Sequence, residues 1–474
     1  MPPIAPGPNA DCPPDAPVAP RARPAGVCPQ LELRPTEPDP APIGAASRLP
    51  FSWMATTAAS VAEICAAAKR ASQPLATVGS EIKDAALEAV AQAIEERVPE
   101  ILDANAQDLE DARAGDYNSA FLEKLRLDEA RIAAMADGVR TIAALPDPAG
   151  EVIDGFRLPN GLDVRKVRVP LGVVAVVYEA RPNVTIDAAA LCLKAGNAIV
   201  LRGSSAASRS NAILAGLAAS AVAGVGLPED ALGLVSGSGR EEIAELATQT
   251  GLVDLIVPRG GEGLKESLKA VATVPVLYAA SGNCHLYIDR WSDQDAAEAI
   301  VLNAKLQRPG VCNAIETLLV HADVPTPFLR RALTALHDAG VTLHGDERAR
   351  AAVPELPIDV ASEADWDTEY LALELAVRVV DSVEEAIAHI NAHGSGHSEA
   401  IVTRDTAAAR AFQIGVDAAC VYVNASTRFT DGGEFGMGAE IGNSTQKLHA
   451  RGPIGIRELC TFKYLVEGDG HVRP

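Results

Sequence analysis

The strongest constraint on the fold is a regular alternation of strand-length apolar runs and helical segments that begins at residue 173. The first run, VVAVVY at 173–178, has no charged side chain, and a segment with helical periodicity follows it. Near-continuous apolar strands joined by helices are typical of parallel sheets that helices cover on both faces. The pattern therefore predicts an α/β protein built on doubly wound sheets.

The alternation occurs in two successive series, which predicts two tandem α/β domains. In the first series we expect strands at 173–178, 198–202, 231–235, 253–257 and 274–278, with helices near 185–195, 208–224, 240–249 and 262–272. In the second we expect strands near 284–288, 314–320, 375–380, 399–403 and 420–424, with helices near 293–307, 327–339, 382–392 and 405–414. Ligands of such sheets bind at the carboxyl ends of the strands.

A helical region precedes the first series. It runs from about residue 56 to Pro146, and Ile82, Ala86, Ala89 and Ala93 fall on one helical face, which we expect to be the buried one.

Residues 151–169 differ from both series because they form two extended runs around Pro159-Asn160-Gly161. Asn-Gly is the strongest short hairpin signal, since both turn positions need a positive φ. Two strands alone are marginal in water. We therefore expect the hairpin to meet the C-terminal strand candidate 461–467 across a two-fold axis, and replacement of Val164 and Val167 by lysine to favour the monomer.

The first 50 residues carry 15 of the chain's 32 prolines, no lysine and no period of 2 or 3.6. Such a segment cannot bury enough surface to offset its ordering entropy, so we expect residues 1–53 to be a disordered extension. A proline-rich ligand tail is the functional alternative, and we favour the disordered extension over it.

The charge and cysteine content exclude several classes of function. The net charge of −22 opposes binding to nucleic acid, which needs a basic footprint. Eight scattered cysteines with no C-x-x-C favour a reducing compartment, and we expect a cytoplasmic protein. The uncharged stretch 210–228 is rich in Ala and Gly and ends in a helix stop, so we expect a buried helix and no membrane association.

Two strand ends carry small residues and a guanidinium group where a dinucleotide would lie. They are Arg202-Gly203-Ser204-Ser205 and Arg259-Gly260-Gly261-Glu262-Gly263. Glycine lets backbone N–H groups approach a phosphate, and a helix start favours an anion. Neither is a G-x-G-x-x-G, so on these residues alone we favour ordinary turn chemistry between a strand and a helix.

Cys312 is the candidate nucleophile. It stands on a Pro-Gly turn between a helix that ends near Gln307 and a strand that begins near Ala314, and Arg308 is close in sequence. Backbone donors and positive charge would favour its thiolate. Asn183, which we place at the end of the first strand, could donate to an oxyanion. A lone cysteine is more commonly a small buried apolar residue.

Two histidine patterns are weaker candidates. His389, His393 and His397 are spaced by four, but Gly394 and Gly396 interrupt the helix and no glutamate occupies the zinc-protease position, so we expect no metal. Cys284 and His285 are neighbours on a strand and point to opposite faces, which excludes a simple Cys–His pair.

Long blocks of the chain resemble the γ-glutamyl phosphate reductases, or glutamate-5-semialdehyde dehydrogenases, of the aldehyde dehydrogenase superfamily. The resemblance runs from about residue 56 to 474. Its most specific blocks are 169–203, 255–264 (LIVPRGGEGL), 303–313 (NAKLQRPGVCN), 421–440 and 444–455.

The resemblance implies a fold, with boundaries expected as follows. Residues 54–150 and 170–282 would form a cofactor-binding domain, 283–430 a catalytic domain, and 151–169 with 440–474 a small β oligomerisation element. It implies a homo-oligomer, with coupling to the glutamate kinase that supplies a labile acyl phosphate.

The resemblance also implies the reaction: NADPH reduces γ-glutamyl phosphate to glutamate 5-semialdehyde with release of phosphate, in proline biosynthesis. Cys312 matches the nucleophile and Asn183 the oxyanion donor. The positions matching the NADP(H) site are Arg202, Ser205, Arg259, Gly260, Gly261 and Glu369, and we expect the small-molecule substrate to meet Arg181, Arg308, Ser426, Thr427 and Arg428.

One departure from the wider superfamily is informative. Hydrolytic aldehyde dehydrogenases carry a water-activating glutamate where this chain reads Tyr278-Ala279-Ala280-Ser281-Gly282-Asn283, without a carboxylate. The missing base opposes a hydrolytic aldehyde dehydrogenase. An acyl-CoA reductase and a non-catalytic scaffold are the remaining alternatives, and the presence of Cys312 and Asn183 opposes the scaffold.

Overall fold

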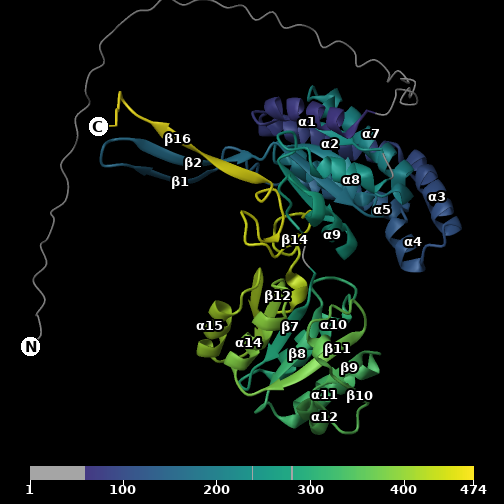
Figure 1. Cartoon of the computed structure of the whole chain (residues 1–474), viewed down its shortest axis with the longest axis vertical. Coiled ribbons are helices and arrows are strands. Elements are labelled where there is room, and N and C mark those ends of the chain that lie inside the picture. Colours follow the sequence, from purple (N-terminus) through teal and green to yellow (C-terminus); the bar gives the residue numbers. More distant parts are fainter. Residues whose placement is uncertain (1–58, 237–238, 279–280, 474) are drawn as a thin grey trace, which may run out of the picture. The chain divides into compact units, whose positions relative to one another are not determined.

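The computed structural model describes residues 59–473 except 237–238 and 279–280 (Figure 1). The expected extension 1–53 lies outside the described residues. Residues 56–474 form one compact unit that contains two parallel sheets with helices packed on them, which confirms the α/β prediction. We describe each sheet in turn, because the site lies at strand ends.

The first sheet has four parallel strands in the order β5-β4-β3-β6. They are β3 (Val173–Tyr178), β4 (Ala198–Arg202), β5 (Leu232–Leu234) and β6 (Leu255–Arg259). Every residue of β3 and β4 is buried, as their apolar sequences predict. The expected fifth strand at 274–278 is reduced to a single bridge between Ile256 and Val276, because Pro275 has no N–H to donate to a ladder.

Nine helices of the described residues pack around this sheet and its flank. They are α1 (Val61–Leu75), α2 (Ser80–Glu96), α3 (Val98–Ala114), α4 (Ser119–Leu125), α5 (Glu129–Ala143), α6 (Asn183–Lys194), α7 (Ser208–Gly224), α8 (Arg240–Ala247) and α9 (Glu262–Val271), with short 3₁₀ turns η1 (Ser205–Ala207) and η2 (Glu229–Ala231). No described helix is both long and apolar enough to span a bilayer. Leu214, Ala218 and Val222 of α7 are buried in the core.

The buried face of α2 differs from the expected one. Ile82 is 46% exposed, whereas Lys83 is 1% exposed and Ala86 is buried. Nζ of Lys83 donates to Oδ2 of Asp147 at 2.9 Å. A buried ammonium is tolerated when it is paired and hydrogen-bonded, so this ion pair rotates the helix face by one residue relative to the apolar pattern.

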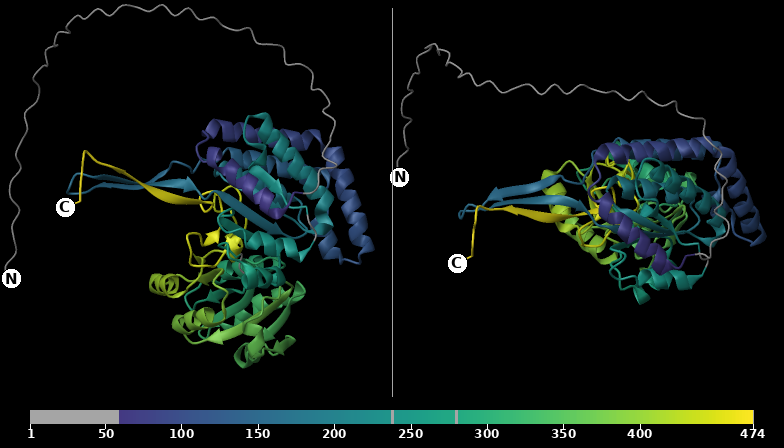
Figure 2. Two further views of the ribbon diagram at one scale, coloured as in Figure 1. Left: turned by 45° about the horizontal axis from the view of Figure 1, so that its top comes forward. Right: turned by 90° about the horizontal axis from the view of Figure 1, so that it is seen from above.

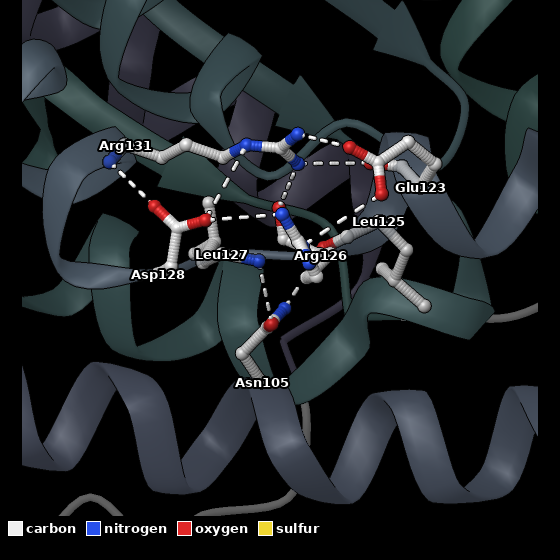
Figure 3. A network of polar contacts seen from close by, with 7 residues as sticks. All are labelled: Asn105, Glu123, Leu125, Arg126, Leu127, Asp128 and Arg131. Atoms are coloured by element: carbon white, nitrogen blue, oxygen red, sulfur yellow. Dashed lines mark hydrogen bonds and ion pairs between the residues drawn. The ribbon is translucent and has the colours of Figure 1, made fainter.

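A polar network joins α3 to the segment between α4 and α5 (Figure 3). Nδ2 of the buried Asn105 donates to the carbonyl of Leu125 at 2.9 Å, and its Oδ1 accepts from N–H of Leu127 at 2.8 Å. Leu125 is the last residue of α4, and Leu127 follows the helix. These two backbone groups have no partner inside the helix, and the side-chain amide of Asn105 supplies one for each. Asp128 caps α5 by accepting from N–H of Arg131.

The second sheet has seven parallel strands in the order β10-β9-β11-β8-β7-β12-β13. They are β7 (Cys284–Ile288), β8 (Ile315–His321), β9 (Thr342–Gly345), β10 (Ile358–Val360), β11 (Glu374–Val380), β12 (Ser398–Val402) and β13 (Cys420–Val423). The accompanying helices are α10 (Gln294–Leu306), α11 (Thr326–Asp338), α12 (Glu347–Ala352), α13 (Glu363–Trp366), α14 (Val383–His393) and α15 (Thr406–Gly415), followed by the 3₁₀ turn η3 (Thr427–Phe429). The sequence patterns missed β9, β10, α12 and α13, which are only three to six residues long.

The hairpin is present as β1 (Val152–Arg157) and β2 (Asp163–Pro170). The C-terminal strand β16 (Cys460–Glu467) pairs with β2 of the same chain, with Leu465 opposite Arg165. The three strands lie side by side in every view (Figures 1 and 2). The expectation that β16 meets the hairpin across a two-fold axis was therefore wrong, because one chain already brings the two segments together. A small ladder, β14 (Asn443–Ser444) with β15 (Gly452–Pro453), precedes β16.

A buried ion pair holds α10 against β8. Nζ of Lys305 lies 2.6 Å from Oε2 of Glu316, and both side chains are inaccessible to solvent. We expect Lys305→Ala to lower the free energy of unfolding by about 3–5 kcal/mol, because it leaves a buried carboxylate unpaired. Urea denaturation measures this loss. The double variant Lys305→Met/Glu316→Leu should lose less than the sum of the single variants, and additive losses would contradict an interacting pair.

Candidate active site

Cys312 lies on the loop between the end of α10 at Leu306 and the start of β8 at Ile315. A turn closes around it, in which N–H of Ala314 donates to the carbonyl of Val311 at 3.0 Å. The helix and strand boundaries fall within one residue of those expected. Cys312 is therefore held at the amino end of the second sheet, and it is the one cysteine of the described residues that is not fully buried.

Hydrogen bonds from Asn313 attach this loop to η3. Nδ2 of Asn313 donates to the carbonyl of Thr430 at 2.9 Å, and Oγ1 of Thr427 donates to the carbonyl of Asn313 at 2.7 Å. Thr427 and Ser426 are buried, and Ser426 caps η3 by accepting from N–H of Arg428. Of the expected substrate residues in this segment, Arg428 alone is accessible to a ligand.

The backbone of Gly282 lies directly behind Cys312. A Cβ at Gly282 would fall 1.5 Å from the carbonyl oxygen of Cys312 and 2.6 Å from its Cα. N–H of Gly282 donates to Oε1 of Glu369 at 2.6 Å, and Sγ of Cys284 donates to the carbonyl of Cys312 at 3.1 Å. The segment before β7 thus forms the floor of the nucleophile loop, and only glycine fits at 282.

The electrostatic environment of Cys312 differs from the sequence expectation. Burial raises the pKa of the Cys312 thiol above its ordinary value, while the Arg259 guanidinium opposes the rise and the carboxylates of Glu369 and Glu440 add to it. Arg308, four residues earlier in the sequence, is not the cation that acts most on the thiol. Cys312 therefore rests as a thiol that a proton acceptor must help to ionise.

This arrangement predicts how fast Cys312 reacts with iodoacetamide. Because its pKa lies above the usual value of about 8.5, the alkylation rate should rise throughout pH 6–9. Arg259→Gln should slow alkylation at each pH, since removing the cation raises the pKa further. Peptide mapping by mass spectrometry follows Cys312 alone, and Arg330→Gln on the exposed face of α11 is the matched control. A plateau below pH 8 would contradict a raised pKa.

Asn183 is the first residue of α6, five residues beyond the strand end at which the sequence pattern placed it. Its Nδ2 donates to Oδ2 of Asp187, one helical turn later, at 2.9 Å. Burial raises the pKa of Asp187 to about 6, and in its ionised form this carboxylate can only accept. It therefore fixes the amide orientation and leaves the second N–H of Asn183 available for an oxyanion.

Four guanidinium groups share the environment of Cys312. Burial and the positive charges of Arg259 and Arg308 lower the pKa of Arg181. Burial and the charge of Arg308 likewise lower the pKa of Arg428, and a Cys312 thiolate would raise the pKa of both. Repulsion among close cations indicates a site prepared for an anion.

Glu440 is a second titratable group that the sequence patterns did not reveal. Burial raises its pKa to about 7, and the Arg259 guanidinium opposes the rise. Its Oε2 is buried and has no hydrogen-bond partner among the described residues. With Asp187, it gives the site two carboxyl groups that titrate near neutrality. The sequence patterns singled out neither residue, because loop packing brings Glu440 to the site.

All the expected cofactor residues except Glu369, which accepts from N–H of Gly282, lie at the carboxyl ends of the first sheet. Arg202 ends β4 and Ser205 begins η1, while Arg259 ends β6 and Gly260 and Gly261 precede α9. Nε of Arg202 is a buried donor without a partner among the described residues, and N–H of Gly261 donates to the carboxylate of Glu179 at 3.2 Å. The first donor has no partner and the second already binds a carboxylate. Donors of this kind at strand ends fit the phosphates of a dinucleotide.

The two histidine patterns have structural partners. Sγ of Cys284 approaches Nδ1 of His397 at 3.8 Å, whereas Nδ1 of His285 lies 3.0 Å from Oε2 of Glu399, so the neighbouring side chains do diverge. His389 contacts the ring of His393 with centroids 4.6 Å apart. Within the described part of the chain, no three His, Cys, Asp or Glu side chains group as metal ligands.

Known proteins with the same fold and similar sequence identify the family. The model of the aldehyde dehydrogenase family matches residues 48–350. The γ-glutamyl phosphate reductase of Thermobifida fusca is 54% identical over 413 residues, which cover 87% of this chain and 98% of that protein. The crystal structure of γ-glutamyl phosphate reductase from Thermotoga maritima has a TM-score of 0.86 at 42% identity and covers 88% of this chain and all of its own.

A more distant likeness shows the fold alone. An acetylating aldehyde dehydrogenase from Geobacillus thermoglucosidasius has a TM-score of 0.62 at 19% identity and covers 87% of this chain and 97% of its own. The same family is indicated by the tandem α/β architecture, by the cysteine on the helix-to-strand loop and by the nearer relatives. The chain belongs to the aldehyde dehydrogenase family of nicotinamide-dependent oxidoreductases and is grouped by sequence with the γ-glutamyl phosphate reductases.

Proposed function

We propose that the chain reduces γ-glutamyl phosphate with NADPH to glutamate 5-semialdehyde and phosphate, the second step from glutamate to proline, through a thioester on Cys312. The observation that carries this proposal is a thiol nucleophile whose surroundings hold four guanidinium groups. An acyl phosphate brings a dianionic leaving group to the carbon that the thiol attacks, and such a cluster neutralises it. The names of relatives at 52–54% identity support the same substrate.

Cys312 begins the reaction by attacking the acyl carbon. The S–C bond forms, the bond between that carbon and the phosphate oxygen breaks, and the thiol proton leaves with the phosphate. Asn183 and N–H of Cys312 stabilise the oxyanion, and each such donor contributes about 3–4 kcal/mol in comparable sites. Arg181 and Arg308 neutralise the departing phosphate.

The residues that would hold the cofactor are the strand-end groups Arg202, Arg259, Gly260 and Gly261, with Ser205 at the start of η1 and Glu369, which accepts from N–H of Gly282. When bound, the nicotinamide cofactor supplies the hydride that reduces the acyl group. The exposed, neutral Ser205 presents no carboxylate to a 2′-phosphate, which supports NADPH over NADH. The Cys312 thiolate then leaves and takes up a proton.

The reverse reaction tests the proposal. Purified protein with glutamate semialdehyde, phosphate and NADP⁺ should form NADPH, with a much lower rate when NAD⁺ replaces NADP⁺ or sulfate replaces phosphate. Propionaldehyde with coenzyme A in place of phosphate probes the acyl-CoA reductase alternative. NADPH formation that depends on coenzyme A and ignores phosphate would replace our proposal with that alternative.

We propose further that the enzyme is cytoplasmic and receives its labile substrate from a glutamate kinase. We also propose that it is a homo-oligomer, and the sheet β1-β2-β16 supports this last point. Phe156, Val164 and Val466 stand opposite one another on one face of this sheet. Phe156 is 48% and Val466 56% exposed. Exposed apolar side chains on a sheet with open edges favour association with a second copy.

Val164 and Val167 are poor positions for the test that the sequence suggested, because they are only 9% and 7% exposed within one chain. We expect Phe156→Lys/Val466→Lys to shift the protein toward the monomer in sedimentation velocity. Lys463→Gln, on the opposite face of β16, should leave the sedimentation coefficient unchanged. A double variant that sediments like the wild type would show that this face is not the contact.

A further inference from the structure

A cavity of about 210 Å³ opens beside the nucleophile loop. Its lining comes from the last turns of α10 and from η3 with the loop that follows it, and consists of Asn303, Gln307, Arg428, Phe429, Asp431 and Glu434. One cation, two anions and two amides therefore line a space with room for a small polar molecule.

The cavity is joined to Cys312 through Asn313. The side chain of Asn313 donates to the carbonyl groups of Thr430 and Arg428, the latter at 3.4 Å, and its own carbonyl accepts from Thr427. These bonds fix the segment that carries Arg428 and Asp431 to the residue next to the nucleophile. A molecule held in the cavity is therefore held at a set position relative to the thiol.

The cavity has one charged donor, the guanidinium group of Arg428, and two charged acceptors, the carboxylates of Asp431 and Glu434. Nε of Arg428 donates to Oε1 of Gln307 at 2.7 Å, which orients the guanidinium group. The charge of Asp431 acts on Arg428, and Oδ1 of Asp431 accepts from N–H of Gly433 at 2.9 Å. An oriented guanidinium group pairs with a carboxylate, whereas two carboxylates pair with an ammonium group.

We infer that this cavity is the subsite for the α-amino acid end of the substrate, with Arg428 binding the α-carboxylate and Asp431 and Glu434 binding the α-ammonium group. The inference rests on the proposed function and goes beyond it, because it assigns the groups that select an amino acid from other acyl phosphates. The α-carbon of a glutamyl group lies three carbon–carbon bonds from its reacting carbonyl. Arg428 of the lining is close enough to Cys312 for the charges of the two groups to interact.

Two aldehydes that differ only in the amino group separate the two roles. Glutamate 5-semialdehyde carries the carboxylate and the ammonium group, and 5-oxopentanoate carries the carboxylate alone. For each aldehyde, kcat/KM of a variant is divided by that of the wild type, which cancels differences in the fraction of free aldehyde. Asp338→Asn, on the exposed end of α11, is the matched control and should give ratios near one.

We expect Asp431→Asn/Glu434→Gln to lower kcat/KM for glutamate semialdehyde at least tenfold more than for 5-oxopentanoate. Arg428→Gln should lower both about equally, by about 10- to 100-fold, since both aldehydes carry the carboxylate. Equal losses for the two aldehydes in the acidic double variant would overturn the assignment of Asp431 and Glu434. Full activity of Arg428→Gln would overturn the assignment of Arg428.

A binding measurement keeps this inference distinct from the proposed function. L-Glutamate should protect Cys312 from iodoacetamide at lower concentration than glutarate, which lacks the amino group, and the acidic double variant should erase the difference. Protection of this kind would support the subsite even if no phosphate-dependent turnover were found. Equal protection by glutamate and glutarate in the wild type would overturn the subsite even if turnover were found.

Discussion

Cys312→Ser is expected to abolish turnover, with a loss of at least about 10³-fold in kcat, while the protein remains folded. A serine hydroxyl is far less acidic than a thiol, and no histidine among the described residues hydrogen-bonds to the side chain at 312 to activate it. The raised pKa of the Cys312 thiol makes the contrast larger, because even the native sulfur needs help to ionise. Steady-state assays with NADPH measure the loss, and circular dichroism checks the fold.

The buried Cys284 provides a control for Cys312. Cys284→Ser keeps a donor toward the carbonyl of Cys312 and should retain most of the activity. If Cys312→Ser kept a substantial part of the wild-type kcat, another residue would have to be the nucleophile.

Gly282→Ala is the second large effect, with an expected loss of about 10²-fold or more in kcat. The added Cβ would fall 1.5 Å from the carbonyl oxygen of Cys312, so the nucleophile loop has to move. A displacement of about 1 Å at a reacting group can cost about 10²-fold in rate. Gly282 has no positive φ to explain its identity, so the close approach of the two backbones is the reason for glycine.

Gly138→Ala is the matched control, because no other group lies within 4 Å of a Cβ at that position. It should retain activity and, being inside α5, should not lower stability. Normal kcat in Gly282→Ala would show that the loop tolerates a side chain there and that the floor does not position Cys312.

The sequence predicted the repeated apolar strands well, because a strand buried on both faces leaves a signal that no other element gives. β3, β4 and β7 begin and end where the pattern places them. The sequence pattern did not predict β9 and β10, because these strands at one edge of the second sheet have only four and three residues. The face of α2 was misjudged because a buried lysine paired with Asp147 looks polar in a sequence.

The site was predictable only in part for a similar reason. Cys312 and Asn183 stand in recognisable blocks, and the structure places Asn183 at the start of a helix where its amide is oriented. Asp187 and Glu440 also lie in such blocks, and Gly282 lies outside them, but the importance of all three comes from contacts between segments far apart in sequence. The pKa of Cys312 was misjudged because a nearby arginine in the sequence says nothing about burial.

The central claim is that Cys312 carries the acyl group as a thioester which phosphate, and not water, resolves. Rapid mixing of the enzyme with glutamate semialdehyde and NADP⁺ in phosphate-free buffer tests this claim most directly. We expect a burst of one NADPH per active site followed by almost no turnover, and steady turnover once phosphate is added. Steady NADPH formation without phosphate, or turnover on phosphate addition with no preceding burst in its absence, would contradict the account.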